Sequence, residues 1–252
     1  HEWHLNWPAV LQGPDRERGI AYCMADARAA LRIMVKIGES FREAGVAFDR
    51  PLSPGFLAGR KFGERVPKLN RDAQEAGHAS YYGGRVEIWR RGRIGPVTIY
   101  DIRSAYPAVQ AQLTNITDSA RTDRWSRDAR YGSYLCRVET ADPLVPYRPL
   151  KGSTIIYPTG RWIDWYARPH VELLREFGAE VEILAAWEYY SDGTPLFPEF
   201  PTYYKERKLK PHLSIAYKLL LNSSYGKLAE VRDAKIRVNG RVKLTDHCWT
   251  AP

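Results

Sequence analysis

A chain of 252 residues with 44% hydrophobic and 12% aromatic content is long and apolar enough to bury a core, which excludes wholesale disorder. No stretch approaches the roughly 18 apolar residues of a membrane span, and the N-terminus resembles no signal peptide, so we expect no membrane partner. The net charge of +9 suits a polyanionic partner such as a nucleic acid, although a basic protein without such a partner fits the charge equally well.

The first predicted element is a helix from about Gly19 to Ala44. Apolar residues recur in it at helical spacing, and Gly45 follows as a stop signal. Residues 49–80 are rich in Pro, Gly, Arg and Lys and show little periodicity. This composition indicates a linker or an extended connection along the surface.

Strand patterns dominate the next part of the chain. Residues 97–100 alternate and predict a half-buried strand that ends at Asp101, and residues 134–138 alternate likewise. A short helix is predicted from Arg168 to Phe177, where Gly178 stops it. A further strand then runs through Val181, Ile183 and Leu184.

A second strong helix is predicted from Pro211 to Gly226, after three prolines that break the chain. Its apolar face consists of Leu213, Ala216, Leu220 and Leu221. Residues 235–244 read as a hairpin around Asn239-Gly240, a pair typical of a type I′ turn. Strands and helices are segregated rather than alternating, which favours an α+β fold.

The segment DIRSAYP, residues 101–107, carries the first chemical pattern. Asp101 follows a predicted strand and enters a tight turn whose N–H groups can face an anion. Carboxylate and carbonyl oxygens are the ligands that Mg²⁺ prefers beside substrate phosphates. The alternative is an ordinary turn aspartate with Tyr106 as a core residue.

The segment KLLLNSSYGK, residues 218–227, carries the second pattern. Lys218, Asn222 and Tyr225 share one helical face, where a lysine can bind a phosphate. Further basic residues precede this face at Lys205, Arg207, Lys208 and Lys210. The alternative is the solvated side of an amphipathic helix.

These segments resemble motifs of the family B DNA polymerases. DIRSAYP is similar to their motif A, DxxSxYP, and KLLLNSSYGK to their motif B, KxxxNSxYG. Tyr81-Tyr82-Gly83-Gly84 resembles the YxGG element that joins the exonuclease and polymerase parts, chiefly in the protein-primed branch. Tyr22 and Asp26 resemble the YxxxD of the third exonuclease motif.

The resemblance implies an antiparallel palm with motif A and helical fingers with motif B, preceded by the helical end of an exonuclease domain. The implied parts are the end of a 3′–5′ exonuclease-like domain (1–48), a linker (49–80), a palm with room for an insertion (81–200), fingers (201–230) and a hairpin returning toward the palm (231–252). Template-directed DNA synthesis with Mg²⁺ is the implied activity. Primer–template DNA, dNTPs and a terminal priming protein are the implied partners, in the cytoplasm of a bacterial or phage-infected cell.

Carried over by position, Asp101 and the carbonyl of Ile102 would bind the metal, and Tyr106 would lie under the deoxyribose. Catalysis would involve Asp101, Tyr106 and Lys218. The implied nucleotide-binding residues are Ile102, Arg103, Ser104, Ala105, Tyr106, Lys218, Asn222 and Tyr225. The implied DNA-binding residues include three members of the basic cluster. They are Tyr81, Gly83, Gly84, Lys205, Arg207, Lys208 and Lys227.

Two departures set limits on this resemblance. The family's motif C, YxDTD, is absent, since Thr245-Asp246-His247 lacks the preceding residues, and the first two exonuclease motifs are missing. Because a two-metal site needs more than one carboxylate, we expect a piece of a longer polymerase that is inactive by itself. A degenerate or split relative that only binds DNA, and an unrelated basic α+β protein, are the alternatives.

Overall fold

The computed structural model describes residues 7–50, 53–65, 67, 69–88, 90–149 and 154–228, and the short strands between 231 and 249. The chain divides into two compact units. We call His1–Gly63 with Glu199–Glu230 and Pro252 the helical unit, and Glu64–Pro198 with Val231–Ala251 the sheet unit. No helix in the described ranges is both long and apolar enough to span a bilayer.

The helical unit begins with α1 (Trp7–Gln12) and the long α2 (Arg16–Glu43), which confirms the first predicted helix. Gly45 has φ +73° and ends α2, and the Val46 N–H donates to the Phe41 carbonyl at 2.9 Å. A glycine adopts this left-handed conformation without the clash of a Cβ. The predicted stop signal is therefore confirmed.

The core of the helical unit lies between α3 (Pro54–Phe62), α7 (Phe200–Leu209) and α8 (Ser214–Leu228). A single 3₁₀ turn, η3 (Pro211–Leu213), leads into α8. The apolar face predicted for this helix is buried, namely Leu213 of η3 and Ala216, Leu220 and Leu221 of α8. Burial of each leucine contributes about 1.5–3 kcal/mol.

Two expectations about helices are wrong. Residues 49–80 are not an extended connection, because they form α3 and, in the sheet unit, α4 (Arg71–Ala79). The Ser53 and Asn70 side chains cap these helices by accepting from the N–H groups of Phe56 and Ala73, at 3.2 and 2.9 Å. Pro201 likewise lies in the first turn of α7, where a missing N–H costs nothing, and does not break the chain.

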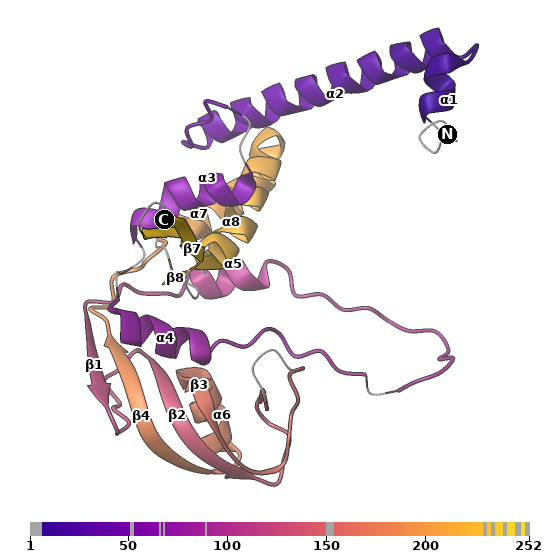
Figure 1. Ribbon diagram of the computed structural model, residues 1–252. Helices are drawn as coiled ribbons and strands as arrows, with labels where there is room; N and C mark the ends of the chain where they lie inside the picture. The colour runs from indigo at the N-terminus through magenta and orange to yellow at the C-terminus, as the bar shows by residue number, and fades with distance from the viewer. Residues whose placement is uncertain are drawn as a thin grey trace. The chain divides into compact units, whose positions relative to one another are not determined.

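The sheet unit contains an antiparallel sheet of β1 (Asp118–Thr122), β2 (Tyr131–Thr140), β3 (Gly160–Ala167) and β4 (Glu180–Tyr190) in the order β1-β4-β2-β3. Between β3 and β4, α6 (Arg168–Glu176) packs on one face, and Gly178 with φ +76° follows it (Figure 1). The predicted strands through residues 134–138 and 181–184 and the predicted helix from Arg168 are confirmed.

The core of the sheet unit lies under α6. Tyr134, Cys136 and Val138 alternate along β2 and are fully buried against Val171 and Leu174 of α6. On the opposite face, the Ser133 hydroxyl shares a hydrogen bond with Ser80 at 3.0 Å, and the Tyr189 hydroxyl donates to the Ala73 carbonyl at 3.0 Å. These two bonds attach α4 to the other side of the sheet.

The predicted strand at residues 97–101 is wrong. Figure 1 shows the segment between α4 and α5 (Ala105–Gln110) as a long loop, and the described residues of this segment form neither helix nor strand. Ile99 and Tyr100 are each 89% exposed. An alternating pattern becomes a strand only when its backbone pairs with a neighbour, and no strand in the described ranges pairs with this loop.

The C-terminal hairpin is confirmed, since β6 (Lys235–Val238) pairs antiparallel with β7 (Arg241–Leu244) in the register Val238↔Arg241. A second short pair joins β5 (Val231–Arg232) and β8 (Cys248–Trp249). The turn at 239–240 and Thr245-Asp246-His247 lie outside the described residues. Segregated helices and antiparallel strands confirm the predicted α+β class.

Candidate functional site

The exposed face of α8 carries the first group of predicted site residues. Lys218, Asn222 and Tyr225 are all exposed, on the side away from the buried leucines. They lie four and then three residues apart, so they follow one another along a single helical stripe. The structure therefore brings this trio together as the spacing predicts.

The basic cluster before α8 is less uniform than its sequence indicates. Lys205 and Lys208 are exposed, and the Lys208 ammonium lies 4.6 Å from the centre of the Tyr204 ring. Lys210 instead forms an ion pair with Glu206 at 3.1 Å, and hydrogen bonds from Tyr217 and Lys210 lower the pKa of that glutamate. Arg207 is partly buried, and the side chain of Lys227 lies outside the described ones. Lys205 and Lys208 are thus the residues of this cluster best exposed to a polyanion.

The turn before α5 carries the second group. Asp101, Ile102 and Arg103 are exposed, and Ser104 has φ 54° and ψ 41°. Ser104 is the one described residue other than glycine with a positive φ. Its carbonyl accepts the first helical hydrogen bond, from the Ala108 N–H at 3.0 Å, while its side chain makes no capping bond. The turn therefore stores backbone strain three residues after Asp101.

We expect the strain at Ser104 to be visible in unfolding experiments. Ser104→Gly removes the clash of a left-handed Cβ but adds chain entropy, so the free energy of unfolding should stay the same or rise by up to about 1 kcal/mol. Ser104→Val places a β-branched side chain in the same conformation and should lower it by roughly 1–3 kcal/mol. Urea denaturation of both variants tests this, and a Val variant as stable as the Gly variant contradicts it.

Tyr106 is not a core residue. Its side chain is 56% exposed, whereas Pro107 and Gln110 on the same short helix are buried. A tyrosine that filled the core would lose most of its accessible surface, as Tyr134 and Tyr166 do in this unit. The ring is therefore largely exposed, five residues after Asp101 in the chain.

The described residues do not hold a pair of metal ions by themselves. Among them no group of three His, Cys, Asp or Glu side chains comes close enough to bind a metal. Asp101 supplies one carboxylate, and both Asp101 and the following residue Ile102 are exposed. One carboxylate fits part of a hard-cation site.

The remaining predicted residues lie in α2 and at the start of the long loop. Tyr22 and Asp26 are one turn apart on α2, where the negative charge of Asp26 and its hydrogen bond with Tyr22 raise the pKa of the tyrosine. Tyr81, Gly83 and Gly84 are exposed at the beginning of the loop. The group at Asp101 belongs to the sheet unit and the trio on α8 to the helical unit.

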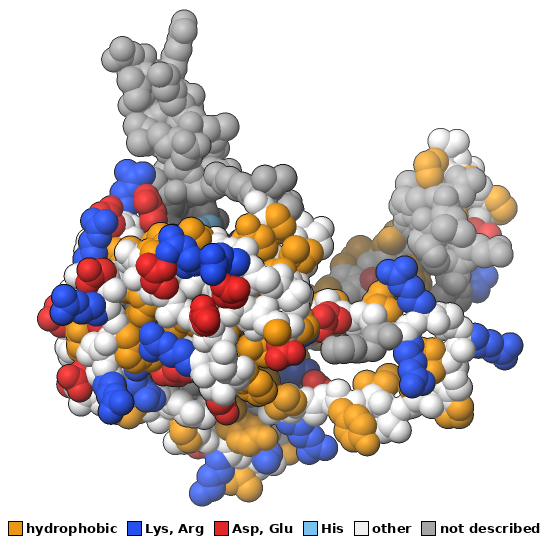
Figure 2. Space-filling view, turned by 90° about the horizontal axis from the view of Figure 1, so that it is seen from below, with side chains coloured by type: hydrophobic (Ala, Val, Ile, Leu, Met, Phe, Trp, Pro, Cys, Tyr) orange, Lys and Arg blue, Asp and Glu red, His pale blue; other side chains and the backbone are white. Residues whose placement is uncertain are grey.

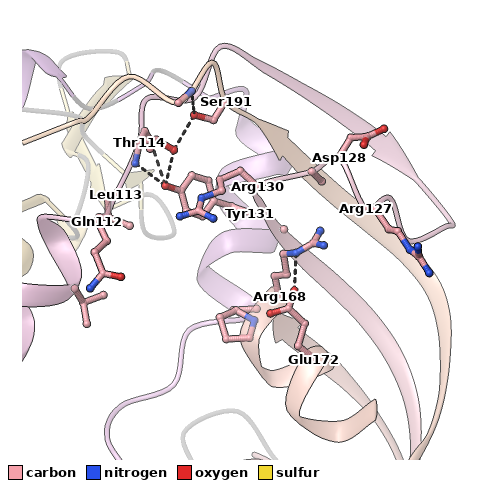
Figure 3. A pocket seen from close by; sticks show the side chains of 16 residues that line it. Gln112, Leu113, Thr114, Arg127, Asp128, Arg130, Tyr131, Arg168, Glu172 and Ser191 are labelled. Atoms are coloured by element: carbon pink, nitrogen blue, oxygen red, sulfur yellow. Dashed lines mark hydrogen bonds and ion pairs between the residues drawn. The ribbon is translucent and has the colours of Figure 1, made fainter. Parts of the chain in front are cut away.

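The sequence did not predict a cavity of about 780 Å³ in the sheet unit (Figure 3). Arg127, Arg130 and Arg168 line it, and Arg168 forms an ion pair with Glu172 at 2.9 Å. At its other end Thr114 accepts from the Ser191 hydroxyl at 2.7 Å. None of the predicted site residues lines this cavity. The cavity forms only when distant parts of the chain pair as strands, so no local sequence pattern predicts it.

Charge is mixed on the face of the sheet unit seen in Figure 2, where basic and acidic side chains alternate rather than gather by sign. Ion pairs between neighbouring strands of the sheet unit also bring opposite charges together, such as Arg137 with Glu182 and Arg161 with Glu139. The overall basic excess is therefore not concentrated on that face.

Comparison with known proteins gives consistent results. Residues 16–238 match the family model described as DNA polymerase type B, organellar and viral. A probable DNA polymerase of Podospora anserina is 25% identical over 126 residues, which cover 48% of this chain and 10% of that protein.

Solved structures of Phi29 DNA polymerase have a similar fold. The complex with primer–template DNA and incoming nucleotide substrates matches with a TM-score of 0.59 at 20% identity, over 82% of this chain and 42% of that one. The complex with single-stranded DNA gives 0.58 at 19% identity, over 84% and 42%. This chain thus spans less than half the length of these relatives.

Proposed function

The chain belongs to the organellar and viral type B DNA polymerases, and from this premise we propose that the full-length protein performs template-directed DNA synthesis in the cytoplasm of a bacterial or phage-infected cell. Because residues 16–238 match this family, the alternative of an unrelated basic α+β protein is excluded. No observation favours the alternative of a relative that binds DNA without chemistry. Primer–template DNA and dNTPs are the proposed substrates, and a terminal protein the proposed primer.

The proposed roles follow the two exposed groups. Asp101 and the carbonyl of Ile102 would supply oxygen ligands to Mg²⁺, which would stabilise negative charge on the transferred phosphate. The strained turn at Arg103, Ser104 and Ala105 would present N–H groups to the triphosphate. Lys218 would neutralise phosphate charge, while Asn222 and Tyr225 would line the base-pair pocket.

The proposed parts of the protein follow from the same family. The segment 1–48 would end an exonuclease-like domain, with Tyr22 and Asp26 in its third motif, and α7 and α8 would be the fingers. Motif A would belong to the palm, and the sheet β1-β4-β2-β3 would be an insertion between motifs A and B. DNA contacts are proposed at Tyr81, Gly83, Gly84, Lys205, Arg207, Lys208 and Lys227.

The exposure of Tyr106, five residues after Asp101, is the observation that carries the proposal. A ring at this point can close the space beside C2′ of the incoming sugar, so that a 2′-hydroxyl would clash with it. We expect Tyr106→Val in the full-length protein to lower the preference for dATP over rATP at least tenfold in kcat/KM, or about 1.4 kcal/mol. Paired kinetics with the two nucleotides measure it.

Tyr100→Val is the matched control, because Tyr100 is also exposed and lies on the same loop. Its nucleotide preference should equal that of the unsubstituted protein. An unchanged ratio in Tyr106→Val, with both rates reduced, would mean that Tyr106 serves stability and not sugar selection.

A further inference from the structure

A buried hydrogen bond joins α7 to α8 next to the exposed face of α8. The two helices pack against each other in the helical unit (Figure 1), and the Tyr217 hydroxyl of α8 donates to Glu206 Oε2 of α7. Tyr217 is 3% exposed, whereas the next residue, Lys218, is exposed. Consecutive residues of a helix lie about 100° apart around its axis, so any rotation of α8 that moves Tyr217 also moves Lys218.

Both partners of this bond are held in place by further contacts. The Tyr217 ring stacks on the Tyr203 ring of α7, with centroids 4.8 Å apart. Glu206 Oε1 accepts from Lys210 Nζ at 3.1 Å, so both oxygens of the carboxylate have a partner. Burial raises the pKa of Tyr217, and the hydrogen bond to Glu206 raises it further, so the hydroxyl stays protonated and remains a donor.

The apolar face of α8 does not by itself fix the rotation of the helix. Ala216, Leu220 and Leu221 are fully buried, and α8 packs against α3 as well as α7. Burial of apolar surface has no preferred direction and tolerates a small shift of one helix along another. A hydrogen bond to a carboxylate weakens steeply when its geometry changes. The bond from Tyr217 to Glu206 is therefore the contact that defines how α8 is rotated against α7.

A second polar attachment joins the start of α8 to the end of α2. His212 Nε2 lies 2.9 Å from Glu43 Oε1, and the Ser40 hydroxyl donates to the His212 carbonyl at 2.8 Å. The side chains of His212 and Glu43 are 60% and 56% exposed, and exposed pairs of this kind contribute little to stability. The buried bond to Glu206 should therefore control the position of Lys218 more strongly than this attachment does.

We propose that Glu206 and Tyr217 are positioning residues that hold α8 in the orientation in which Lys218 meets the phosphates of the incoming dNTP, an inference that rests on the proposed function. Neither side chain contacts the nucleotide in this role. A carboxylate near a triphosphate would repel it, and the ion pair with Lys210 offsets that charge. Because Lys218 is oriented before the nucleotide arrives, nucleotide binding does not have to order it.

Tyr217→Phe in the full-length protein is the principal test, since it keeps the stacked ring and removes only the hydroxyl. We expect the KM for dNTP to rise about five- to tenfold and kcat to fall no more than about threefold, because α8 then adopts other rotations. Glu206→Gln keeps the size of the side chain and leaves a weaker, neutral acceptor, so KM should rise about two- to threefold. The Kd for primer–template DNA should stay within about twofold in both variants.

A double-mutant cycle with Lys218→Ala separates positioning from a general loss of stability. If Tyr217 acts through Lys218, Tyr217→Phe should change kcat/KM for dNTP by less than about twofold in a protein that already lacks the Lys218 ammonium. A loss of stability unrelated to Lys218 would lower kcat/KM by the same factor with and without that ammonium. Equal factors in the two backgrounds would therefore overturn the inference.

Tyr166→Phe is the matched control. The Tyr166 hydroxyl is also buried, donates to the Pro146 carbonyl at 2.8 Å and accepts from Trp162 Nε1 at 2.7 Å, but it belongs to the sheet unit. Its removal should lower thermal stability about as much as Tyr217→Phe does and leave the KM for dNTP unchanged. An equal rise of KM in this control would mean that destabilisation alone causes the effect, and would contradict the inference.

Failure of this inference is distinct from failure of the proposed function. A normal KM for dNTP in Tyr217→Phe, in a protein that incorporates nucleotides, would overturn the inference and leave the proposed function standing. An unsubstituted full-length protein that incorporates no nucleotides would overturn both.

Discussion

Asp101→Asn in the full-length protein should lower Mg²⁺-dependent nucleotide incorporation by about a thousandfold or more. The substitution keeps the size of the side chain and removes the negative charge that a hard cation requires. Because Asp101 is exposed, its loss should not disturb the core. The affinity for primer–template DNA should therefore stay within about twofold of normal.

Single-turnover primer extension over a range of Mg²⁺ concentrations measures this effect. Asp123→Asn is a suitable control, because Asp123 is an exposed aspartate of the sheet unit whose ion pair is with its neighbour Arg124. The control should extend primers normally. If Asp101→Asn kept more than a few per cent of the turnover, the assignment of motif A would be wrong.

Lys218→Ala should lower kcat/KM for dNTP by about a hundredfold, with a higher KM and a lower kcat, since positioning and charge neutralisation supply most of phosphoryl-transfer catalysis. Lys218 is exposed on α8 and supports no part of the leucine core. Thermal unfolding should consequently be unchanged.

Comparison with Lys208→Ala distinguishes a specific role of Lys218 in nucleotide binding from a general effect of positive charge. Lys208 lies in the basic cluster and should affect the DNA affinity, reducing the slope of log Kd against log salt by about one, with little effect on dNTP kinetics. Steady-state kinetics and salt titrations of both variants provide the comparison. Similar losses of dNTP kcat/KM in the two variants would remove the distinction between them.

Local patterns in the sequence predicted the elements whose cause is local. The buried leucine face of α8 follows from helical periodicity, and the buried alternation of β2 follows from the two-residue period of a strand. The helices α3 and α4 have only nine residues each, so their capping residues Ser53 and Asn70 were the better signal.

Features that depend on distant partners could not be predicted in this way. The alternation at residues 97–100 indicates a strand, yet pairing decides whether it forms one. The bond from Tyr82 to Asp164 joins residues 82 positions apart, so no local pattern contains it. The motif residues Asp101 and Lys218 were recognised by order and spacing, while the left-handed turn at Ser104 became visible only in the structure.

The exposed loop around residues 97–100 also bears on how the chain behaves in concentrated solution. Val97, Ile99 and Tyr100 are apolar or aromatic, highly exposed and β-prone, and the stretch carries no charge of its own. Extended segments of this kind pair readily with strands of other molecules. Pro96 and Asp101, on either side of this segment, are residues that oppose such intermolecular strand pairing. Self-association and precipitation of the 252-residue chain would therefore begin at this loop, and a charged residue in place of Ile99 is the most direct remedy.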